Sequence, residues 1–358
     1  MKRTALMTEV GRDWDAFHAA DITQKLPYFS RAGRLYDCLF SQQFDRTLLD
    51  HMFSVADRLR GVTQTKAGAD AVSRLLAHKR AMLYFVQPST RTFLSFLNAC
   101  HIMGLKTSEI RDTSTSSEMK GESPEDTVRT FSSYVDLIIM RHPTPGFVEK
   151  TAWFMNRAKR PVPIINGGSG KDQHPTQALL DVYTLHRSLP GGPEGKTIVM
   201  VGDLKRGRTV RSLSYLMKNY QGVKLVFVSP PQLRMEADIL DFLERHHIPH
   251  RETDDFAAAM PEADAIYMTR IQDEHDTAGE SKSLDLSRFH FRAEHLKVIK
   301  PTTIIMHPLP RRHEIAVPVD EDDRAVFWRQ ERNGMWIRAA LISYIFGVDG
   351  QIPAPGKV

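Results

Sequence analysis

Residues 81–103, AMLYFVQPSTRTFLSFLNACHIM, contain a short apolar run, a polar turn and an amphipathic segment. The run Ala81–Val86 suits a buried strand, and Ser89–Met103 has the length and apolar spacing of a helix. That helix would open with Ser89-Thr90-Arg91-Thr92. A helix N-terminus presents unpaired N–H groups and a positive dipole end, and an arginine can contact phosphate through two parallel bonds. The four residues are therefore a candidate anion site, although on their own a helix cap with a surface arginine explains them as well.

The same alternation of apolar runs and helical segments continues along the chain. Further strands are expected at Val135–Met140, Pro161–Asn166, Thr197–Gly202, Lys224–Ser229, Ala263–Thr269 and Thr302–Met306. Helices are expected within Gln42–Arg60 with Asp45 as a candidate N-cap, and at Gly146–Arg157, Pro175–Leu189, Thr209–Tyr220, Met235–His247 and Gly334–Phe346. Continuous apolar strands joined by helices indicate parallel sheets that are covered on both faces. We expect an α/β protein with two doubly wound parallel-sheet domains joined by interdomain helices.

The composition excludes several classes of protein. The 358 residues include 48 Lys and Arg against 43 Asp and Glu. The basic residues form no block of five in a row, and the sequence contains no aromatic-basic RNA-binding signature. We find no apolar stretch of about 18 residues and no apolar core near the N-terminus, so neither a membrane span nor a secretory signal is expected. The two cysteines, Cys38 and Cys100, lack metal-ligand spacing. We expect a cytoplasmic protein that uses no metal or cofactor and binds neither nucleic acid nor membrane.

Three motifs in order along the chain resemble those of the transcarbamoylase family. They are Gln87-Pro88-Ser89-Thr90-Arg91-Thr92, Met140-Arg141-His142-Pro143 and the segment Asp172–Asp181, DQHPTQALLD. The resemblance covers roughly residues 35–345 and implies a carbamoyl-phosphate-binding domain over residues 35–174, to which a C-terminal helix at 331–358 returns. An aspartate-binding domain would follow at residues 175–330, and residues 1–34 would be an N-terminal extension.

The resemblance also implies roles for residues on the carbamoyl phosphate side. Ser89, Thr90, Arg91 and Thr92 would hold the phosphate, and Arg141 would contact both the phosphate and the carbamoyl oxygen. His174 would donate to that oxygen, and Gln177 would hold the carbamoyl amide nitrogen. Ser116–Glu122, SSEMKGE, resembles a family loop that enters the neighbouring subunit's site, so Ser116 and Lys120 would reach carbamoyl phosphate bound by another chain. Alone, this segment is typical of a solvated loop.

The amino-acid side shows a similar likeness to the aspartate-carbamoylating branch of the family. Gly202–Val210, GDLKRGRTV, would supply Arg208, and Thr269-Arg270-Ile271-Gln272 would supply Arg270 and Gln272. Two arginines suit a dicarboxylate, because each can make a paired planar contact. In His307-Pro308-Leu309-Pro310-Arg311, the carbonyls of Pro308 and Leu309 would hold the attacking amine and the carbamoyl nitrogen. The resemblance implies that Lys120 would also contact aspartate.

The sequence departs from the family pattern at a few positions. Phe93 and Leu97 stand where many relatives carry an arginine and a glutamate, so an apolar pair replaces a charged one. His275 follows Glu274 where some relatives carry an arginine. These differences concern loop closure and remove no expected substrate contact.

The function implied is transfer of the carbamoyl group from carbamoyl phosphate to the α-amine of L-aspartate, which gives N-carbamoyl-L-aspartate and phosphate in de novo pyrimidine biosynthesis. Arg91, Lys120, Arg141 and His174 would be the catalytic residues. The resemblance implies a homotrimer with shared sites, and it leaves regulatory or dihydroorotase-like partner chains open. Two alternatives remain: a transcarbamoylase with a different amine acceptor, and a non-catalytic transcarbamoylase-like scaffold subunit. A dinucleotide-binding enzyme is disfavoured, because Gly202-Asp203 does not open a GxGxxG fingerprint.

Overall fold

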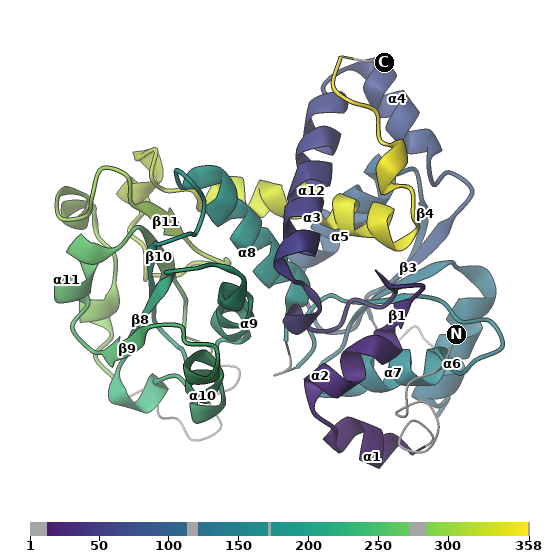
Figure 1. Ribbon diagram of the computed structural model, residues 1–358, viewed down its shortest axis with the longest axis horizontal. Helices are drawn as coiled ribbons and strands as arrows, with labels where there is room; N and C mark the ends of the chain where they lie inside the picture. Colours follow the sequence, from purple (N-terminus) through teal and green to yellow (C-terminus); the bar gives the residue numbers. More distant parts are fainter. Residues whose placement is uncertain (1–12, 113–120, 171–172, 272–283, 357–358) are drawn as a thin grey trace. The chain divides into compact units, whose positions relative to one another are not determined.

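The computed structural model describes residues 13–112, 121–170, 173–271 and 284–356. The chain forms two compact units, one of Met1–Thr176 with Gly334–Val358 and the other of Gln177–Asn333. The boundaries fall inside two helices, α8 (Pro175–Ser188) and α12 (Phe327–Ile345). Figure 1 shows the course of the chain. Each unit is described by itself.

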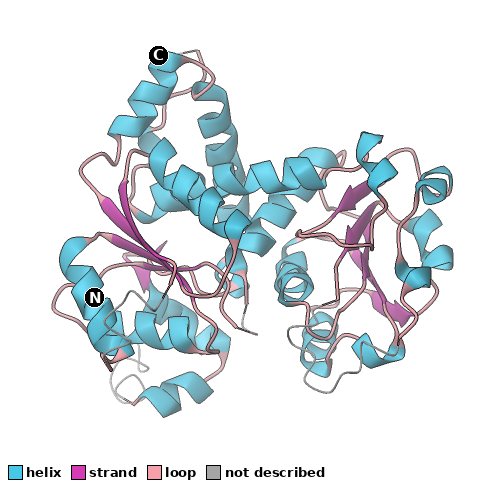
Figure 2. Ribbon diagram, turned by 180° about the vertical axis from the view of Figure 1, so that it is seen from behind, coloured by secondary structure: helices cyan, strands magenta, loops and turns pink. Residues whose placement is uncertain are grey.

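The first unit is built on a parallel sheet with the strand order β4-β3-β5-β6. Its strands are β3 (Arg80–Phe85), β4 (Lys106–Ile110), β5 (Leu137–Arg141) and β6 (Ile164–Asn166). Its helices are α1 (Trp14–Ala19), α2 (Ile22–Lys25), α3 (Arg46–Val62), α4 (Lys66–Arg74), α5 (Thr90–Ile102), α6 (Pro124–Tyr134) and α7 (Phe147–Met155), and a small hairpin pairs β1 (Ser30–Arg31) with β2 (Arg34–Leu35). The helices cover both faces, with α3, α4 and α5 on one side and α1, α6 and α7 on the other (Figure 2).

The second unit repeats this plan with five parallel strands in the order β11-β10-β7-β8-β9. The strands are β7 (Thr197–Val201), β8 (Lys224–Val228), β9 (His250–Thr253), β10 (Ala265–Met268) and β11 (Ile304–Met306). Helices α9 (Arg208–Leu216) and α10 (Ala237–Arg245) lie on one side of the sheet, and α11 (Phe256–Ala259) packs in a core cluster on the other. The expected fold of two parallel-sheet α/β domains is confirmed.

Two strands of the parallel sheets, β4 and β9, were not predicted from the sequence, and neither were the two-residue strands β1 and β2 of the hairpin. Both β4 and β9 are at sheet edges. In β4, KTSEI, and β9, HRET, each residue is at least partly exposed. Their side chains are mostly polar or exposed, so the apolar signal that identifies the other strands is absent. The remaining two edge strands, β6 and β11, are fully buried and were predicted. By contrast, each residue of β5 is buried.

The described part of the expected N-terminal extension, residues 13–34, is folded into the first unit. Phe17 and Phe29 are fully buried in the same cluster as strand residues Met82 and Ile138. The segment is also held by an ion pair of 2.8 Å between Lys25 Nζ and Glu149 of α7, and Lys25 is only 4% exposed. Helices of six and four residues are too short to show a helical period, which is why the sequence pattern did not predict them.

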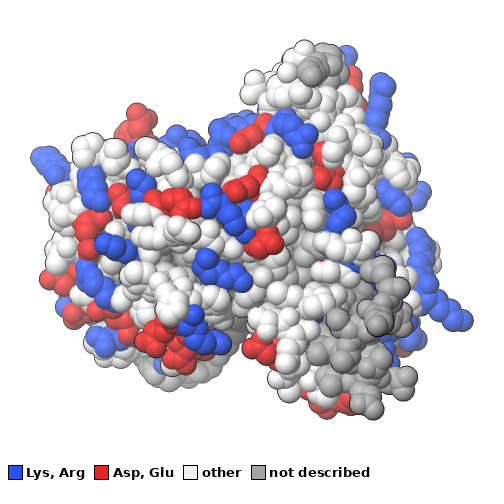
Figure 3. Space-filling view, viewed as in Figure 1, with Lys and Arg blue, Asp and Glu red and all other residues white. Residues whose placement is uncertain are grey.

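Charged residues of both signs are intermingled over the face drawn in Figure 3, so the small basic excess forms no single-sign field there. Within the described ranges, no helix is long and apolar enough to cross a membrane.

Candidate active site

The C-terminal ends of β3 and β5 form the point where the strand order of the first sheet reverses. From β3 the chain moves outward to β4 and then returns to β5 on the other side of β3. In open α/β sheets, ligands bind at such switch points, beyond the carboxyl ends of the strands. The segment Ser89–Thr92 follows β3, and Arg141 is the last residue of β5. The register pairs Phe85 with Arg141, so the two predicted phosphate-binding segments leave the sheet side by side.

Ser89 occupies the N-cap position of α5. It has extended backbone dihedrals, and its side chain makes no capping hydrogen bond to the helix. Thr90 is exposed, Arg91 is half-buried and Thr92 is buried. An uncapped first turn keeps N–H groups available for an anion, so the local geometry fits the expected phosphate cradle.

Arg141 and His174 meet around Gly168. Arg141 is 7% exposed and donates from Nη1 to the carbonyl of Gly167 at 3.1 Å, and His174 is 3% exposed. A Cβ placed on Gly168 would lie 2.6 Å from Cδ2 of His174 and 2.8 Å from Nη1 of Arg141. Gly168 also has a φ of +94°, which side-chain-bearing residues rarely adopt. The close approach of two predicted site residues therefore depends on this glycine.

The loop that carries Gly168 is anchored by Asn166 at the end of β6. Its Oδ1 accepts from the Gly168 N–H at 2.8 Å, and its Nδ2 donates to the Gln173 carbonyl at 3.1 Å. The Gln173 side chain in turn accepts from the Ser41 N–H at 2.7 Å. These bonds fix the backbone directly before His174. Neither Asn166 nor Gly168 was singled out from the sequence, although an Asn-Gly-Gly run after a strand is a signal of a tight turn.

The apolar residues Phe93 and Leu97 belong to α5. Phe93 is 3% exposed and packs edge-on against Phe85 with ring centroids 5.5 Å apart. The guanidinium of Arg111 lies over the same ring at 4.4 Å, a cation–π arrangement. Phe93 is therefore a core residue at the base of the cradle, and Leu97 is half-buried on the same helix.

The second sheet reverses its strand order between β7 and β10. At that point a Cβ on Gly202 would lie 2.3 Å from the carbonyl oxygen of Thr269, so the backbones that follow the two strands run in contact. Asp203 is fully buried and accepts from the Arg206 N–H at 3.0 Å, which shapes the turn before α9. Arg208 is the first residue of α9 and is half-buried.

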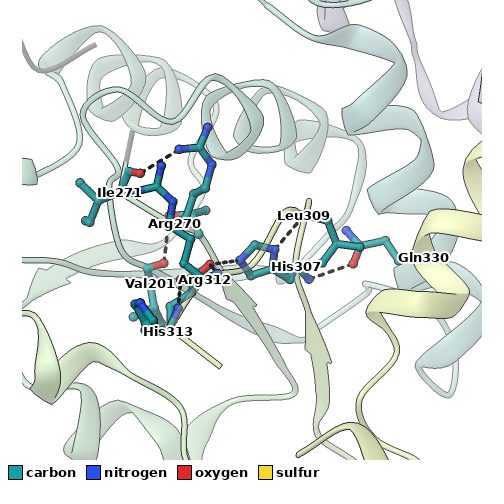
Figure 4. A network of polar contacts seen from close by, with 10 residues as sticks. Val201, Arg270, Ile271, His307, Leu309, Arg312, His313 and Gln330 are labelled. Carbon is teal, nitrogen blue, oxygen red and sulfur yellow. Dashed lines mark hydrogen bonds and ion pairs between the residues drawn. The ribbon is translucent and has the colours of Figure 1, made fainter. Parts of the chain in front are cut away.

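Arg270 follows β10 directly, is half-buried and donates from Nη1 to the carbonyl of Ile271 at 3.0 Å (Figure 4). The strand end is held by Thr269, whose N–H donates to the Val201 carbonyl at 2.8 Å. Both arginines predicted for the amino acid therefore belong to segments that leave the sheet of the second unit at its switch point.

His307 orders the turn after β11. Its Nδ1 accepts from the Leu309 N–H at 2.7 Å, so the ring proton is on Nε2, which donates to Glu314 at 2.7 Å (Figure 4). Burial alone would raise the pKa of Glu314, but bonds from His307 and from backbone N–H groups hold that pKa below its usual value. Leu309 has a φ of +49°, so this turn presents its carbonyls in a fixed and unusual conformation.

Gln177 and Asp181 lie four residues apart on α8, and both are buried. Gln177 donates from Nε2 to Asp181 at 3.0 Å. No role was predicted for Asp181, although a glutamine and an aspartate at i, i+4 on a helix are a recognisable pair. Ser116, Lys120 and Gln272 lie outside the described residues.

The chain matches both domain models of one family. The model for the carbamoyl-P binding domain of aspartate/ornithine carbamoyltransferases matches residues 37–187, and the model for their Asp/Orn binding domain matches residues 194–345.

Individual relatives agree with these matches. A chloroplastic aspartate carbamoyltransferase of Oryza sativa subsp. japonica is 41% identical over 322 residues, which cover 87% of this chain and 85% of the relative. An aspartate carbamoyltransferase catalytic subunit of Methanosarcina acetivorans is 39% identical, over 86% of this chain and 96% of its own length. The multifunctional protein CAD of Squalus acanthias is 42% identical, but the match spans only 13% of that much longer protein.

Solved structures show the same likeness. Aspartate transcarbamoylase from Trypanosoma cruzi, in complex with carbamoyl aspartate and phosphate, superposes with a TM-score of 0.78 at 33% identity, over 86% of this chain and 94% of that one. The catalytic subunit of M. jannaschii aspartate transcarbamoylase superposes with a TM-score of 0.77 at 33% identity, over 87% and 98%. The chain belongs to the aspartate/ornithine carbamoyltransferase family.

Proposed function

We propose that the chain transfers the carbamoyl group of carbamoyl phosphate to the α-amine of L-aspartate, which yields N-carbamoyl-L-aspartate and phosphate. The observation that carries the proposal is the approach of Arg141 and His174 around Gly168, beside the uncapped N-terminus of α5. Relatives of about 40% identity are named aspartate carbamoyltransferases, and one solved neighbour holds carbamoyl aspartate and phosphate.

On the carbamoyl phosphate side, we assign the phosphate to Ser89–Thr92 and Arg141. The α5 N-terminus and the two guanidinium groups of Arg91 and Arg141 suit a dianionic phosphate. As the amine nitrogen attacks the carbamoyl carbon, negative charge develops on the carbonyl oxygen, and fixed donors from Arg141 and His174 would stabilise it. The C–N bond forms, the C–O bond to phosphate breaks, and the departing phosphate takes the amine proton.

On the amino-acid side, we assign one carboxylate of aspartate to Arg208 and the other to Arg270, with Gln272 helping to place the amino acid. The carbonyls of Pro308 and Leu309 would accept from the attacking amine and from the carbamoyl NH₂, and Gln177 would hold that NH₂. For the two arginines and the two carbonyls, the support is the position of their segments after strands of the second sheet, and the fixed turn that His307 and Glu314 create. For Gln177, the support is its position on α8 three residues after His174.

We further expect a homotrimer in which Ser116 and Lys120 complete the site of a neighbouring chain, working in the cytoplasm in de novo pyrimidine synthesis. The resemblance of Ser116–Glu122 to the family loop supports the shared site, and the buried thiols of Cys38 and Cys100 suit a reducing compartment. Since relatives include both a catalytic subunit and multifunctional proteins, regulatory or dihydroorotase-like partners belong to the same expectation.

The test is a product analysis with the purified chain, carbamoyl phosphate and L-aspartate. Mass spectrometry of N-carbamoyl-L-aspartate and an assay of released phosphate should give equal amounts that rise together with time. Phosphate without the carbamoyl product would identify a phosphatase instead, and absence of both would favour the scaffold interpretation.

A further inference from the structure

Asp181 is a fully buried carboxylate that accepts side-chain hydrogen bonds from several elements of the second unit. Gln177 Nε2 donates to its Oδ1 at 3.0 Å, Gln330 Nε2 donates to the same oxygen at 2.7 Å, and the Tyr267 hydroxyl donates to Oδ2 at 2.7 Å. The three donors come from α8, α12 and β10. A buried carboxylate needs such donors to offset the loss of hydration, so the cluster has a structural reason to exist.

The donors around Asp181 also reach the segments that carry the proposed amino-acid site. Tyr267 lies in β10, three residues before Arg270. Gln330 accepts from the His307 N–H at 2.9 Å through Oε1 (Figure 4). Since the Nε2 of Gln330 donates to Asp181, one side chain joins the turn that contains Pro308 and Leu309 to Asp181.

The directions of these bonds follow from chemistry. A backbone N–H can only donate, so the oxygen of the Gln330 amide must face His307 and its NH₂ group must face Asp181. Burial, and then the neighbouring charge of Asp181, raise the pKa of Tyr267 well above its usual value, so the phenol keeps its proton and donates. Asp181 therefore acts as an acceptor toward each of these groups.

The same constraint sets the orientation of Gln177. An amide has a donor end and an acceptor end, and Nε2 of Gln177 is the donor that faces Oδ1 of Asp181. The carbonyl oxygen Oε1 is then fixed at the opposite end of the amide. Under the proposed function this end meets the carbamoyl NH₂ group, which is a donor and needs an acceptor.

We infer that Asp181 is a positioning residue that holds the acceptor end of Gln177 toward the substrate and so selects an acyl phosphate that carries an amino group. The inference rests on the proposed function. It assigns to Asp181 the discrimination between carbamoyl phosphate and acetyl phosphate, which has a methyl group in place of the NH₂ group. A site that presents a hydrogen-bonding group rejects an analogue that lacks its partner.

The experiment compares wild type with Asp181→Asn. An asparagine at this position offers both a donor and an acceptor, so Gln177 is no longer held in one orientation. In the variant, carbamoyl phosphate should bind about 10-fold more weakly, a typical loss for one hydrogen bond. The inhibition constants of acetyl phosphate and inorganic phosphate, measured in competition with carbamoyl phosphate, should stay within about 2-fold of wild type, because neither ligand uses Oε1 of Gln177. A structural role alone would weaken all three ligands together.

Two further variants separate positioning from packing. Thr184→Val removes the 3.0 Å bond that Thr184 accepts from Asn333, one turn along the same two helices, without touching Gln177. It should leave the ratio of carbamoyl phosphate to acetyl phosphate affinity unchanged. Asp181→Glu keeps a carboxylate acceptor and should keep most of the preference for carbamoyl phosphate over acetyl phosphate. If Asp181→Asn does not fold, the binding measurements on Asp181→Glu provide the test.

The outcomes are distinguishable from a failure of the proposed function. If wild type forms no N-carbamoyl-L-aspartate, the proposed function falls, whatever the variants do. If wild type is active but binds acetyl phosphate as tightly as carbamoyl phosphate, the inference about Asp181 falls alone. The inference also falls if Asp181→Asn leaves the ratio of carbamoyl phosphate to acetyl phosphate affinity unchanged, or if it weakens the binding of all three ligands equally. It falls as well if Asp181→Glu abolishes the preference for carbamoyl phosphate.

Discussion

Gly168 determines how closely Arg141 and His174 can approach each other. Its substitution by alanine would place a methyl group 2.6 Å from the His174 ring and 2.8 Å from Arg141 Nη1, so both side chains must shift. Because a misplacement of about 1 Å at a catalytic group can cost about 100-fold in rate, we expect Gly168→Ala to lower kcat by about that factor. Steady-state kinetics with carbamoyl phosphate and aspartate would measure it.

Gly347 provides the matched control for that variant. It has a φ of +68°, and a Cβ there would meet no atom within 4 Å. Gly347→Ala introduces a comparable backbone strain of about 1 kcal/mol and should lower stability while leaving kcat close to wild type. Equal kinetic losses in both variants would contradict the role assigned to Gly168.

Arg270 and Arg208 are the residues that we predict to bind the carboxylates of aspartate. Replacing Arg270 by alanine would remove the proposed charged contact to a substrate carboxylate. Such a contact is typically worth about 1.5–3 kcal/mol, so kcat/KM for aspartate should fall by roughly 10- to 150-fold. The affinity for carbamoyl phosphate should change little. If the variant mainly lost carbamoyl phosphate affinity, the assignment of substrates to the two units would be wrong.

At the residue scale, the sequence singled out candidate site residues but not the residues that support them. Arg141 and His174 stood out because of their motifs, whereas Gly168 and Asn166 act only through a turn that the chain closes in space. Asp181 was visible as part of a motif, but its partners Tyr267 and Gln330 lie 86 and 149 residues away. Contacts of that separation leave no local pattern in a sequence.

At the scale of the elements, His142 links strand β5 to helix α7. Its ring stacks on Phe147 with centroids 3.7 Å apart, and its Nδ1 accepts from the Thr144 N–H at 3.1 Å. Burial lowers the pKa of His142 to about 4, below its usual value near 6.5. Between these two values the unfolded chain binds more protons than the folded one, so His142 lowers stability as the pH falls from about 6.5 to 4.

His142→Asn should make stability less dependent on pH in this window, because the asparagine oxygen can still accept from Thr144 but does not titrate. Free energies of unfolding from urea titrations at pH 4.5, 5.5 and 6.5 would measure the slope in both proteins. An unchanged slope would show that His142 is not buried in its neutral form.

The ion pair between Lys25 and Glu149 joins the N-terminal segment to α7. Lys25→Met would remove the buried partner of Glu149, which would keep its contact of 3.1 Å with the exposed His18. Breaking a buried pair typically costs about 3–5 kcal/mol, and the His18 contact should keep the loss at or below the lower end of that range. The double variant Lys25→Met/Glu149→Met removes both charges and should recover much of that loss. Urea denaturation of the single and double variants tests the coupling, and equal stabilities of the two would mean that the pair is not buried as described.

The elements themselves were predicted where the hydrophobic pattern is strong. Central strands such as β5 and β7 and long helices such as α5 and α8 agree with the sequence pattern to within a few residues. The edge strands β4 and β9 and the short helices α1 and α2 were not predicted, since polar edge residues and segments of four to six residues carry no distinct period. The longer helices α4 and α6, whose sequences KAGADAVSR and PEDTVRTFSSY contain few large apolar residues, were also not predicted.

At the scale of the whole molecule, the proposal of shared sites predicts complementation between two inactive chains. The Lys120→Ala chain would lack the ammonium group that completes the neighbouring chain's site. The Arg141→Ala chain would lack the guanidinium group of its own site. If the two variants are mixed and reassembled at equal amounts, random pairing around a closed ring should make about one site in four complete, and about a quarter of wild-type activity should return. No recovery, with trimers confirmed by light scattering, would mean that each chain holds a complete site.

The central claim, that this chain carbamoylates aspartate, is tested most directly by its choice of acceptor. The measurement is kcat/KM for L-aspartate and for L-ornithine at saturating carbamoyl phosphate. Since we propose that Arg208 and Arg270 bind two carboxylates, and ornithine carries a cationic side chain in place of one, we expect aspartate to be preferred by at least about 1,000-fold. Comparable or greater activity with ornithine would contradict the account.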